Sequence, residues 1–176
     1  TVTDANACST IATVTLTQPA PITASTTSTA VLCNGDPSGT ATVTANGGTT
    51  PYTYLWNNAQ TTQTATGLTA ANYSVTVTDA QTCSTIATVT VTQPPAVTAS
   101  AVGTNPLCNG AANGTATATG GGGTAPLTYL WSNGQATAAA TGLTAGTHTV
   151  TVTDALGCAN VATVTLTQPT PLTASA

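Results

Sequence analysis

Apolar and polar residues alternate along most of the chain, and threonine occupies many of the polar positions. Residues 40–45 place alanine and valine on one side and threonine on the other. Further on, Tyr52, Tyr54 and Trp56 share one side. This period of two is typical of a strand with one buried face. No segment shows the period of an amphipathic helix, so the sequence predicts an all-β fold.

Glycine, proline and asparagine interrupt the alternating segments at short intervals, as expected of short strands joined by turns. Examples are the pair Gly47-Gly48 and the hairpin signal Asn133-Gly134. Roughly six or seven short strands per unit is the pattern of an immunoglobulin-like β-sandwich. We therefore expect tandem immunoglobulin-like β-sandwich repeats.

A motif of Thr-Val-Thr-Asp-Ala, followed by a cysteine and later by Gln-Pro, begins at Thr1, Thr76 and Thr151, so each copy starts 75 positions after the previous one. This period divides the chain into strands that end a preceding repeat, two complete repeats and the start of another. The expected boundaries are residues 1–21, 22–96, 97–171 and 172–176. Proline restricts its own backbone and that of its predecessor, so Gln93-Pro94-Pro95 predicts a stiff linker and a rod-like array.

Composition narrows the range of partners. Lysine and arginine are absent, and the acidic residues are Asp4, Asp36, Asp79 and Asp154. Without cations the chain cannot neutralise phosphates, so nucleic acid is excluded as a partner and docking on anionic lipid is disfavoured. Hydrophobic residues make up 40% of the sequence, unlike a disordered chain. No apolar run reaches the roughly 18 residues of a membrane-spanning helix, so no direct membrane insertion is expected.

The five cysteines recur at a fixed spacing, which fits an oxidising, extracellular compartment. Pairing within a repeat joins Cys33 to Cys83 and Cys108 to Cys158, and leaves Cys8 with a partner upstream. Pairing across the linker joins Cys8 to Cys33 and Cys83 to Cys108 instead. Four predicted strands separate Cys33 from Cys83, and an even number of antiparallel strands returns the chain to the same end. We therefore favour the pairing within a repeat.

The recurring Asp4, Asp79 and Asp154 are candidate calcium ligands at the junctions. Calcium takes about six to eight oxygen ligands, and one carboxylate per junction supplies few of them. Asp36 would add a second carboxylate, but its equivalent in the next repeat is Ala111. We expect instead that each aspartate accepts backbone N–H bonds in the turn before the cysteine, and we predict no cofactor.

Three other side chains are candidates for a functional role. His148, the single histidine, stands where the first repeat has Tyr73. No nucleophile or metal ligand repeats with it, so we interpret it as an aromatic-sized residue at a strand start. Trp56 and Trp131 are candidate sugar-stacking platforms, but a tryptophan on the central strand of an immunoglobulin-like sandwich is typically its largest buried side chain. We favour the core position for both.

The rows of threonine have three interpretations that the sequence leaves open. They are good β surface, carriers of O-glycans, or a flat array that faces ice or polysaccharide. Asn72 and Asn113 begin Asn-x-Ser/Thr patterns and are candidate N-glycosylation sites. The two asparagines do not occupy equivalent positions in the repeat, which favours chance matches.

Several recurring motifs resemble a known family. They are Cys-Asn-Gly, Gly-Gly, Pro-Tyr-Thr-Tyr-Leu-Trp, Gly-Leu-Thr-Ala, and Val-Thr-Val-Thr-Asp-Ala followed by cysteine. Together they resemble the SprB-type repeats of very large surface adhesins of Bacteroidetes, including the gliding-motility adhesin. The resemblance implies an immunoglobulin-like unit, export by the type IX system and a role in surface adhesion or filaments. Two departures are the missing Asp-Ser/Thr O-glycosylation pattern and the absence of lysine and arginine.

The expected function is a non-catalytic, extracellular structural repeat that forms a stiff stalk or filament of a large bacterial surface adhesin. The alternative is a carbohydrate- or ice-binding module that uses exposed threonine and aromatic surfaces. Expected partners are neighbouring repeats or other copies in a fibre, joined through weakly charged Thr/Val edge strands, and glycans or cell surfaces. We do not expect an enzyme, because general acid and base groups are almost missing.

Overall fold

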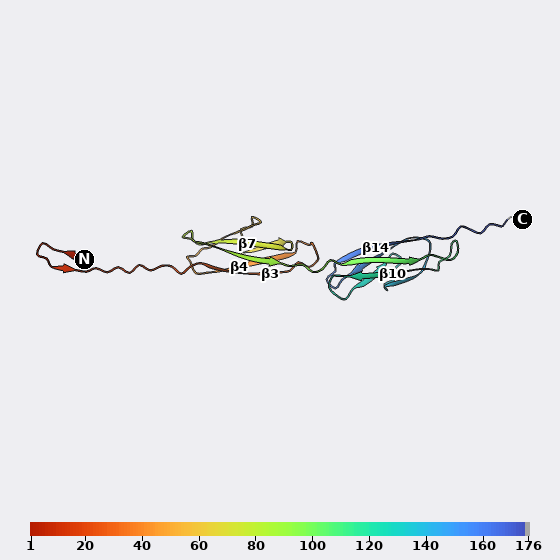
Figure 1. The fold of residues 1–176 in the computed structure, drawn as a ribbon, viewed down its shortest axis with the longest axis horizontal. Helices are drawn as coiled ribbons and strands as arrows, with labels where there is room; N and C mark the ends of the chain where they lie inside the picture. Colours follow the sequence, from red (N-terminus) through yellow and green to blue (C-terminus); the bar gives the residue numbers. More distant parts are fainter. Residues whose placement is uncertain (175–176) are drawn as a thin grey trace.

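The structure, a computed structural model, describes residues 1–174 as two β-sandwiches in tandem, with a short hairpin before them and an extended segment after them (Figure 1). The sandwiches lie end to end along one long axis, and the N-terminal hairpin and the extended segment after the second sandwich lie at opposite ends of it. All regular elements of the described residues are strands, which confirms the all-β fold. Within residues 1–174 there is no helical segment with the length and apolar character to cross a membrane.

The strands repeat with the period of the sequence. The hairpin consists of β1 (Val2–Thr3) and β2 (Ser9–Thr10). The first sandwich contains β3 (Thr23–Thr29), β4 (Gly39–Asn46), β5 (Thr53–Trp56), β6 (Thr64–Leu68), β7 (Ala71–Thr78) and β8 (Ser84–Val91). The second contains β9 (Thr98–Thr104), β10 (Gly114–Gly121), β11 (Thr128–Trp131), β12 (Ala139–Leu143), β13 (Gly146–Thr153) and β14 (Ala159–Leu166).

Each sandwich is made of two three-stranded antiparallel sheets. In the first, the strand orders are β3-β4-β6 and β5-β7-β8, and in the second they are β12-β10-β9 and β11-β13-β14. The immunoglobulin-like architecture is therefore confirmed. The predicted repeats 22–96 and 97–171 each contain one complete sandwich. Of the expected start of a further repeat at 172–176, residues 175–176 lie outside the described residues.

The apolar side of the alternating strands forms the core of each sandwich. Trp56 and Trp131 are 1% and 2% exposed, so their predicted place in the core is confirmed. Each indole Nε1 donates a hydrogen bond to a backbone carbonyl, that of Thr62 at 2.9 Å and that of Thr137 at 3.0 Å. The fully buried ring therefore leaves no polar atom unpaired. Burial also means that neither indole face is free to stack on a sugar.

Strand β3 lies beside β8, and threonine and serine hydroxyls join them in the first sandwich. Thr26 Oγ1 donates to the Thr88 carbonyl at 2.8 Å, and Ser28 Oγ donates to the Thr90 carbonyl at 2.9 Å. In the second sandwich Gly103 stands in the place of Ser28, and side chains of β14 leave no room there for a Cβ. These contacts cover the β3 and β8 edges, so the short β5 and β6 form the remaining edges. On β6 the Gln60 side chain bonds to the backbone N–H and carbonyl of Thr66.

Candidate functional site

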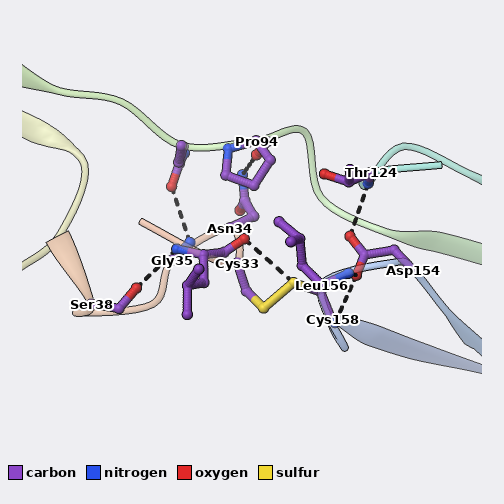
Figure 2. Close-up of a disulfide and its surroundings, with 11 residues drawn as sticks. Cys33, Asn34, Gly35, Ser38, Pro94, Thr124, Asp154, Leu156 and Cys158 are labelled. Carbon is purple, nitrogen blue, oxygen red and sulfur yellow. Dashed lines mark hydrogen bonds between the residues drawn. A yellow bond between two sulfur atoms is a disulfide. The ribbon is translucent and has the colours of Figure 1, made fainter. Parts of the chain in front are cut away.

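The two sandwiches meet at a joint that brings together most of the motifs repeated in the sequence (Figure 2). We call the end where the chain enters a sandwich its proximal end, and the end where the chain leaves it the distal end. The joint therefore consists of the distal end of the first sandwich, the linker of residues 92–97 and the proximal end of the second. Its contacts can be followed residue by residue.

The distal end contributes the Cys33-Asn34-Gly35 loop. Gly35 has a φ of 81°, which glycine adopts readily, and the loop closes when Asp36 N donates to the Cys33 carbonyl at 3.1 Å. Two further bonds tie the loop to the chain leaving the sandwich. Asn34 Nδ2 donates to the Pro94 carbonyl, and Gly35 N donates to Gln93 Oε1, both at 3.0 Å. The loop is therefore held directly against the linker.

The proximal end contributes the turn that leads to Cys158. The Asp154 carboxylate accepts backbone N–H bonds from Leu156 and Cys158 through Oδ1, at 2.9 and 2.8 Å, and from Thr124 through Oδ2 at 2.9 Å. The side chain is 5% exposed. The bond from Thr124 is the largest cause that holds the pKa of the Asp154 carboxyl below its ordinary value; burial acts in the opposite direction and the other backbone bonds add to the lowering.

We expect the second sandwich to lose stability in acid through Asp154. Its pKa is lower in the folded than in the unfolded chain, so the stabilisation is present above the unfolded value of about 3.9 and is lost as pH falls through the folded value. Asp154→Asn should lower the urea midpoint at neutral pH and weaken the dependence of the midpoint on pH below about 5. Asp36→Asn removes the same charge from a loop and is the control. Equal pH profiles for both variants would contradict the role of Asp154.

The linker is hydrogen-bonded from both sides. The Pro94 carbonyl accepts from Asn34 of the first sandwich, whereas the Pro95 carbonyl accepts from Gly123 N of the second at 3.0 Å. Two residues further on, Asn160 Nδ2 donates to the Val97 carbonyl at 2.9 Å. Because both sandwiches donate hydrogen bonds to carbonyls of the linker, the linker has little freedom to bend. The expected stiffness of the proline linker thus has contacts that support it.

Gly122 permits the linker to run close to the second sandwich. Its φ is 65°, and a Cβ there would collide with the carbonyl oxygen of Ala96. We expect Gly122→Ala to destabilise the protein more than Gly134→Ala, which has a φ of 85° but open space around its Cβ position. The control should lose about 1–2 kcal/mol from the left-handed backbone alone. Urea unfolding of both variants measures the difference, and equal losses would show that the contact with Ala96 carries no weight.

A disulfide between Cys33 and Cys158 crosses the joint, with a Cα–Cα distance of 5.6 Å (Figure 2). It connects the distal loop of the first sandwich to the proximal turn of the second, 125 residues later in the chain. The sandwiches are therefore covalently connected twice, once through the linker and once through the disulfide. Within residues 1–174 the other cysteines, Cys8, Cys83 and Cys108, are exposed free thiols.

The predicted disulfides within a repeat, Cys33 to Cys83 and Cys108 to Cys158, are wrong. Four strands do separate Cys33 from Cys83, but their directions do not simply alternate. Strand β6 turns directly into β7, and β5 is antiparallel to β7, so β5 and β6 run the same way.

The two cysteines consequently lie at opposite ends of the first sandwich. The Cys83 turn lies where β4 ends, because Thr49 N bonds to Asp79, whereas Cys33 lies where β4 begins. The eight residues of β4 separate them by roughly 25 Å. Pairing of Cys83 with Cys108 across the linker fails for the same kind of reason, because these thiols lie at the outer ends of the two sandwiches. The predicted partner of Cys8 upstream of the chain stays a prediction.

The recurring aspartates act mainly within their turns, as expected. Asp79 accepts N–H bonds from Gln81, Cys83 and Thr49 in the same arrangement as Asp154. Asp4 accepts two such bonds, from Asn6 and Cys8. Asp36 lies at the distal end of its sandwich and so does not join Asp79. No group of three or more histidine, cysteine or acidic side chains that could hold a metal lies within residues 1–174, and calcium stays an untested alternative.

The remaining candidates have local partners. His148 Nε2 lies 2.9 Å from the Thr144 carbonyl, and Tyr73 OH donates to the equivalent Thr69 carbonyl at 3.1 Å. The histidine thus takes over the contact of the tyrosine, as the interpretation of an aromatic-sized residue implies. Asn72 Oδ1 accepts from Thr90 Oγ1 at 2.6 Å. Both Asn72 and Asn113 are exposed, and their glycosylation stays a prediction.

Sequence reasoning missed the structural roles of several amide side chains. Asn34 and Gln93 fasten the distal loop of the first sandwich, and Asn109 and Gln168 make the same bonds in the second. Asn113 takes the place of Ser38, since each accepts the backbone N–H of the residue before the cysteine. The signal was present in the sequence, because Cys-Asn-Gly and Gln-Pro recur together with the period of the repeat.

The SprB repeat family matches residues 25–61 and 100–136, and the resemblance is confirmed at these two places. No curated protein sequence matches the chain. Similar solved structures include the three N-terminal domains of the Highly Immunogenic Outer Capsid protein of bacteriophage RB49, at 20% identity and a TM-score of 0.43, covering 85% of this chain and 59% of that one.

Two further similar structures are the four N-terminal Ig domains of Dscam1 isoform 1.9 and the C-terminal 282-residue fragment of intimin in complex with the intimin-binding domain of its translocated receptor. The Dscam1 structure is 12% identical, with a TM-score of 0.36 and coverage of 78% of this chain and 42% of that one. The intimin fragment is 19% identical, with a TM-score of 0.36 and coverage of 87% and 64%. This chain thus spans less than two thirds of the length of these structures.

Proposed function

Because the chain carries two SprB repeats, we propose that it is a stalk segment of a large bacterial surface adhesin, whose function is to hold other parts away from the cell. SprB repeats are typical of cell-surface proteins. The observation that carries the proposal is the disulfide from Cys33 to Cys158, which links one repeat to the next. A bond of this kind restrains the angle between domains, and that is a property of a stalk.

The chemistry of the chain agrees with an extracellular place. Disulfides persist in oxidising compartments and are rare in the cytosol. The chain has no lysine or arginine, so trypsin-like proteases have no site in it. The repeat family and the immunoglobulin-like fold indicate a non-enzymatic structural module. An extended, protease-resistant spacer outside the cell accounts for all of these features.

The location and the shape can be tested together. An antibody against this chain should label intact cells of the bacterium that produces it, and electron microscopy should show the label along thin fibres that extend from the surface. Permeabilised cells should gain little additional label. Label that appears only after permeabilisation, or that lies in compact surface particles, would contradict the proposal.

Carbohydrate binding is a second candidate function, and one groove favours it. Residues Asn57, Asn72, Tyr73, Ser74 and Thr88 line an exposed groove over β7 and β8. It offers amides and hydroxyls beside one aromatic ring, which is the chemistry that sugars use. Saturable binding of polysaccharide to the chain, lost in Tyr73→Ala, would support this function. Binding that persists unchanged in Tyr73→Ala would remove the groove as its site.

A further inference from the structure

The contacts of the joint occur once between the two sandwiches, which we call the closed joint. The same residues also recur at the outer end of each sandwich without a neighbouring repeat, and we call these two ends the open halves. The closed joint connects the distal end of the first sandwich to the proximal end of the second. The distal end of the second sandwich carries an open groove between residues 107–109 and residues 169–172. The proximal end of the first carries another, between residues 18–22 and the turn that holds Asp79 and Cys83. Each groove is lined by residues whose equivalents in the other repeat form the closed joint.

Both open halves already have the geometry of the closed joint. At the distal half, Asn109 Nδ2 donates to the Pro169 carbonyl at 3.0 Å and Gly110 N donates to Gln168 Oε1 at 2.8 Å, as Asn34 and Gly35 do in the closed joint. At the proximal half, Cys83 N donates to Asp79 Oδ1 at 2.8 Å, as Cys158 N does to Asp154. The loop and the turn are thus formed before any neighbour is present.

A leucine and a cysteine side chain that are partly covered in the closed joint are more exposed at the open halves. Leu107 is 77% exposed, whereas its equivalent Leu32 is 56% exposed beside the second sandwich. Cys108 and Cys83 are exposed, whereas the bonded Cys33 and Cys158 are half-buried. No charged residue other than aspartate occurs in the chain, so the halves carry little charge to keep a neighbour away.

We propose that the two open halves are docking surfaces for neighbouring repeats of the same kind, and that Cys108 and Cys83 form there the bond that Cys33 forms with Cys158. The inference rests on the proposed stalk function and adds its covalent architecture. The distal groove takes the Asp-x-x-x-Cys turn of the following repeat. The proximal groove takes the Cys-Asn-Gly loop of the preceding repeat. Each disulfide thus joins the distal cysteine of one repeat to the proximal cysteine of the next.

The bond forms by thiol–disulfide exchange. Each of the two thiols loses its proton, an S–S bond joins their sulfur atoms, and two electrons pass to a disulfide oxidant that is reduced to two thiols. The reaction needs no catalytic group of this chain. It needs only that docking brings the Cα atoms to disulfide distance, as in the closed joint at 5.6 Å.

Such an array contains two staggered covalent tethers. The segment from Cys83 to Cys108 consists of β8, the linker and β9, with the short turns that carry the two cysteines. Strand β8 runs from the proximal to the distal end of the first sandwich, and β9 does the same in the second. The segment therefore spans two repeats as nearly extended chain, and a disulfide at each end continues it into the next such segment. Tension along the array then passes through strands that are already extended.

A three-repeat chain tests the proposal. It consists of the full chain with residues 97–171 copied once more directly after Pro171. The copy carries Ala112→Ser and Ala159→Ser, at two exposed positions, so that peptides from the copied cysteines differ in mass from the original ones. After oxidation with a glutathione redox buffer, alkylation and digestion with pepsin in acid, mass spectrometry identifies the bonded cysteines. We expect two disulfides, Cys33 with Cys158 and Cys108 with the copied Cys158. Cys8, Cys83 and the copied Cys108 should be alkylated. The unextended chain should show only the first bond, with Cys108 alkylated.

The variant Cys108→Ser of the three-repeat chain is the matched control and should retain only the bond from Cys33 to Cys158. Circular dichroism shows whether the added repeat folds. With all repeats folded, an alkylated Cys108, or a Cys108 bonded to a cysteine other than the copied Cys158, would overturn the proposed disulfides between successive repeats. If the Cys33–Cys158 bond is intact in that case, the proposed stalk function is not affected. Loss of both bonds in a folded chain would remove the observation that carries the proposed function as well.

Discussion

Pulling on the two ends of the oxidised chain should release far less length than pulling on the reduced chain. The disulfide closes a loop of 125 residues from Cys33 to Cys158, and force applied at the termini bypasses everything inside that loop. At about 3.3–3.6 Å per residue, the loop hides roughly 410–450 Å of chain. Both sandwiches lie largely within it. Even a complete loss of their folding would then lengthen the oxidised molecule only slightly.

Single-molecule force spectroscopy, with handles attached to the termini by cysteine-independent tags, measures this effect. After reduction, or in Cys33→Ser, we expect two unfolding steps, each on the order of 200 Å, because one repeat then unravels at a time. The oxidised chain should show neither step. Cys108→Ser removes a thiol that is free in the structure and should behave like the unchanged chain. Full-length steps in the oxidised chain would contradict a disulfide between the repeats.

Replacing Trp56 with alanine should destabilise the first sandwich by about 3–5 kcal/mol. The indole is 1% exposed, and its Nε1 bond to the Thr62 carbonyl is lost together with its packing. It packs within the core cluster that includes Leu68, Val75 and Val77, and the small core of one sandwich has little other bulk to fill the cavity. A loss of this size is a large fraction of the free energy of unfolding of a small domain.

Leu55→Ala is the matched control for this substitution. Leu55 lies on the same strand but is 56% exposed, so its truncation should change the free energy of unfolding by no more than about 0.5 kcal/mol. Calorimetry or urea unfolding followed by circular dichroism measures both variants. In Trp56→Ala, the fluorescence of the remaining Trp131 should still report the second sandwich near its original midpoint. Equal losses in the two variants would mean that Trp56 does not organise the core.

The hydroxyl side chains on the strands do more than form a polar surface, because some of them also hydrogen-bond one sheet to the other. The hydroxyls of Thr26 and Ser28 donate to carbonyls of β8. In the second sandwich Ala101 and Gly103 stand at these positions, so neither bond is present, and side chains of β14 pack against Gly103 instead. The same closure of two sheets is therefore reached by different side chains in the two repeats. Alternation along a strand predicts which side of it is polar. It does not say which polar groups a neighbouring strand will meet.

The sequence by itself determined the strands, the positions of the turns, the period of the repeat, the buried tryptophans and the local turn role of the aspartates. The hairpin predicted at Asn133-Gly134 is wrong, because the strands that this turn joins, β11 and β12, belong to different sheets. The correctly predicted features follow from residues close in sequence, from the side of a strand that a residue occupies, or from repetition along the chain. The bonds that Asp79 and Asp154 accept from Thr49 and Thr124 were not predicted, because their donors lie 30 positions away.

The disulfide pairing depended on the tertiary structure for two reasons. A pattern with a period of two is the same in both directions along a strand, so it did not show that β5 and β6 run the same way. Moreover, the partner of Cys33 lies in the next repeat, and only the placement of one sandwich against the other brings Cys158 within reach of it.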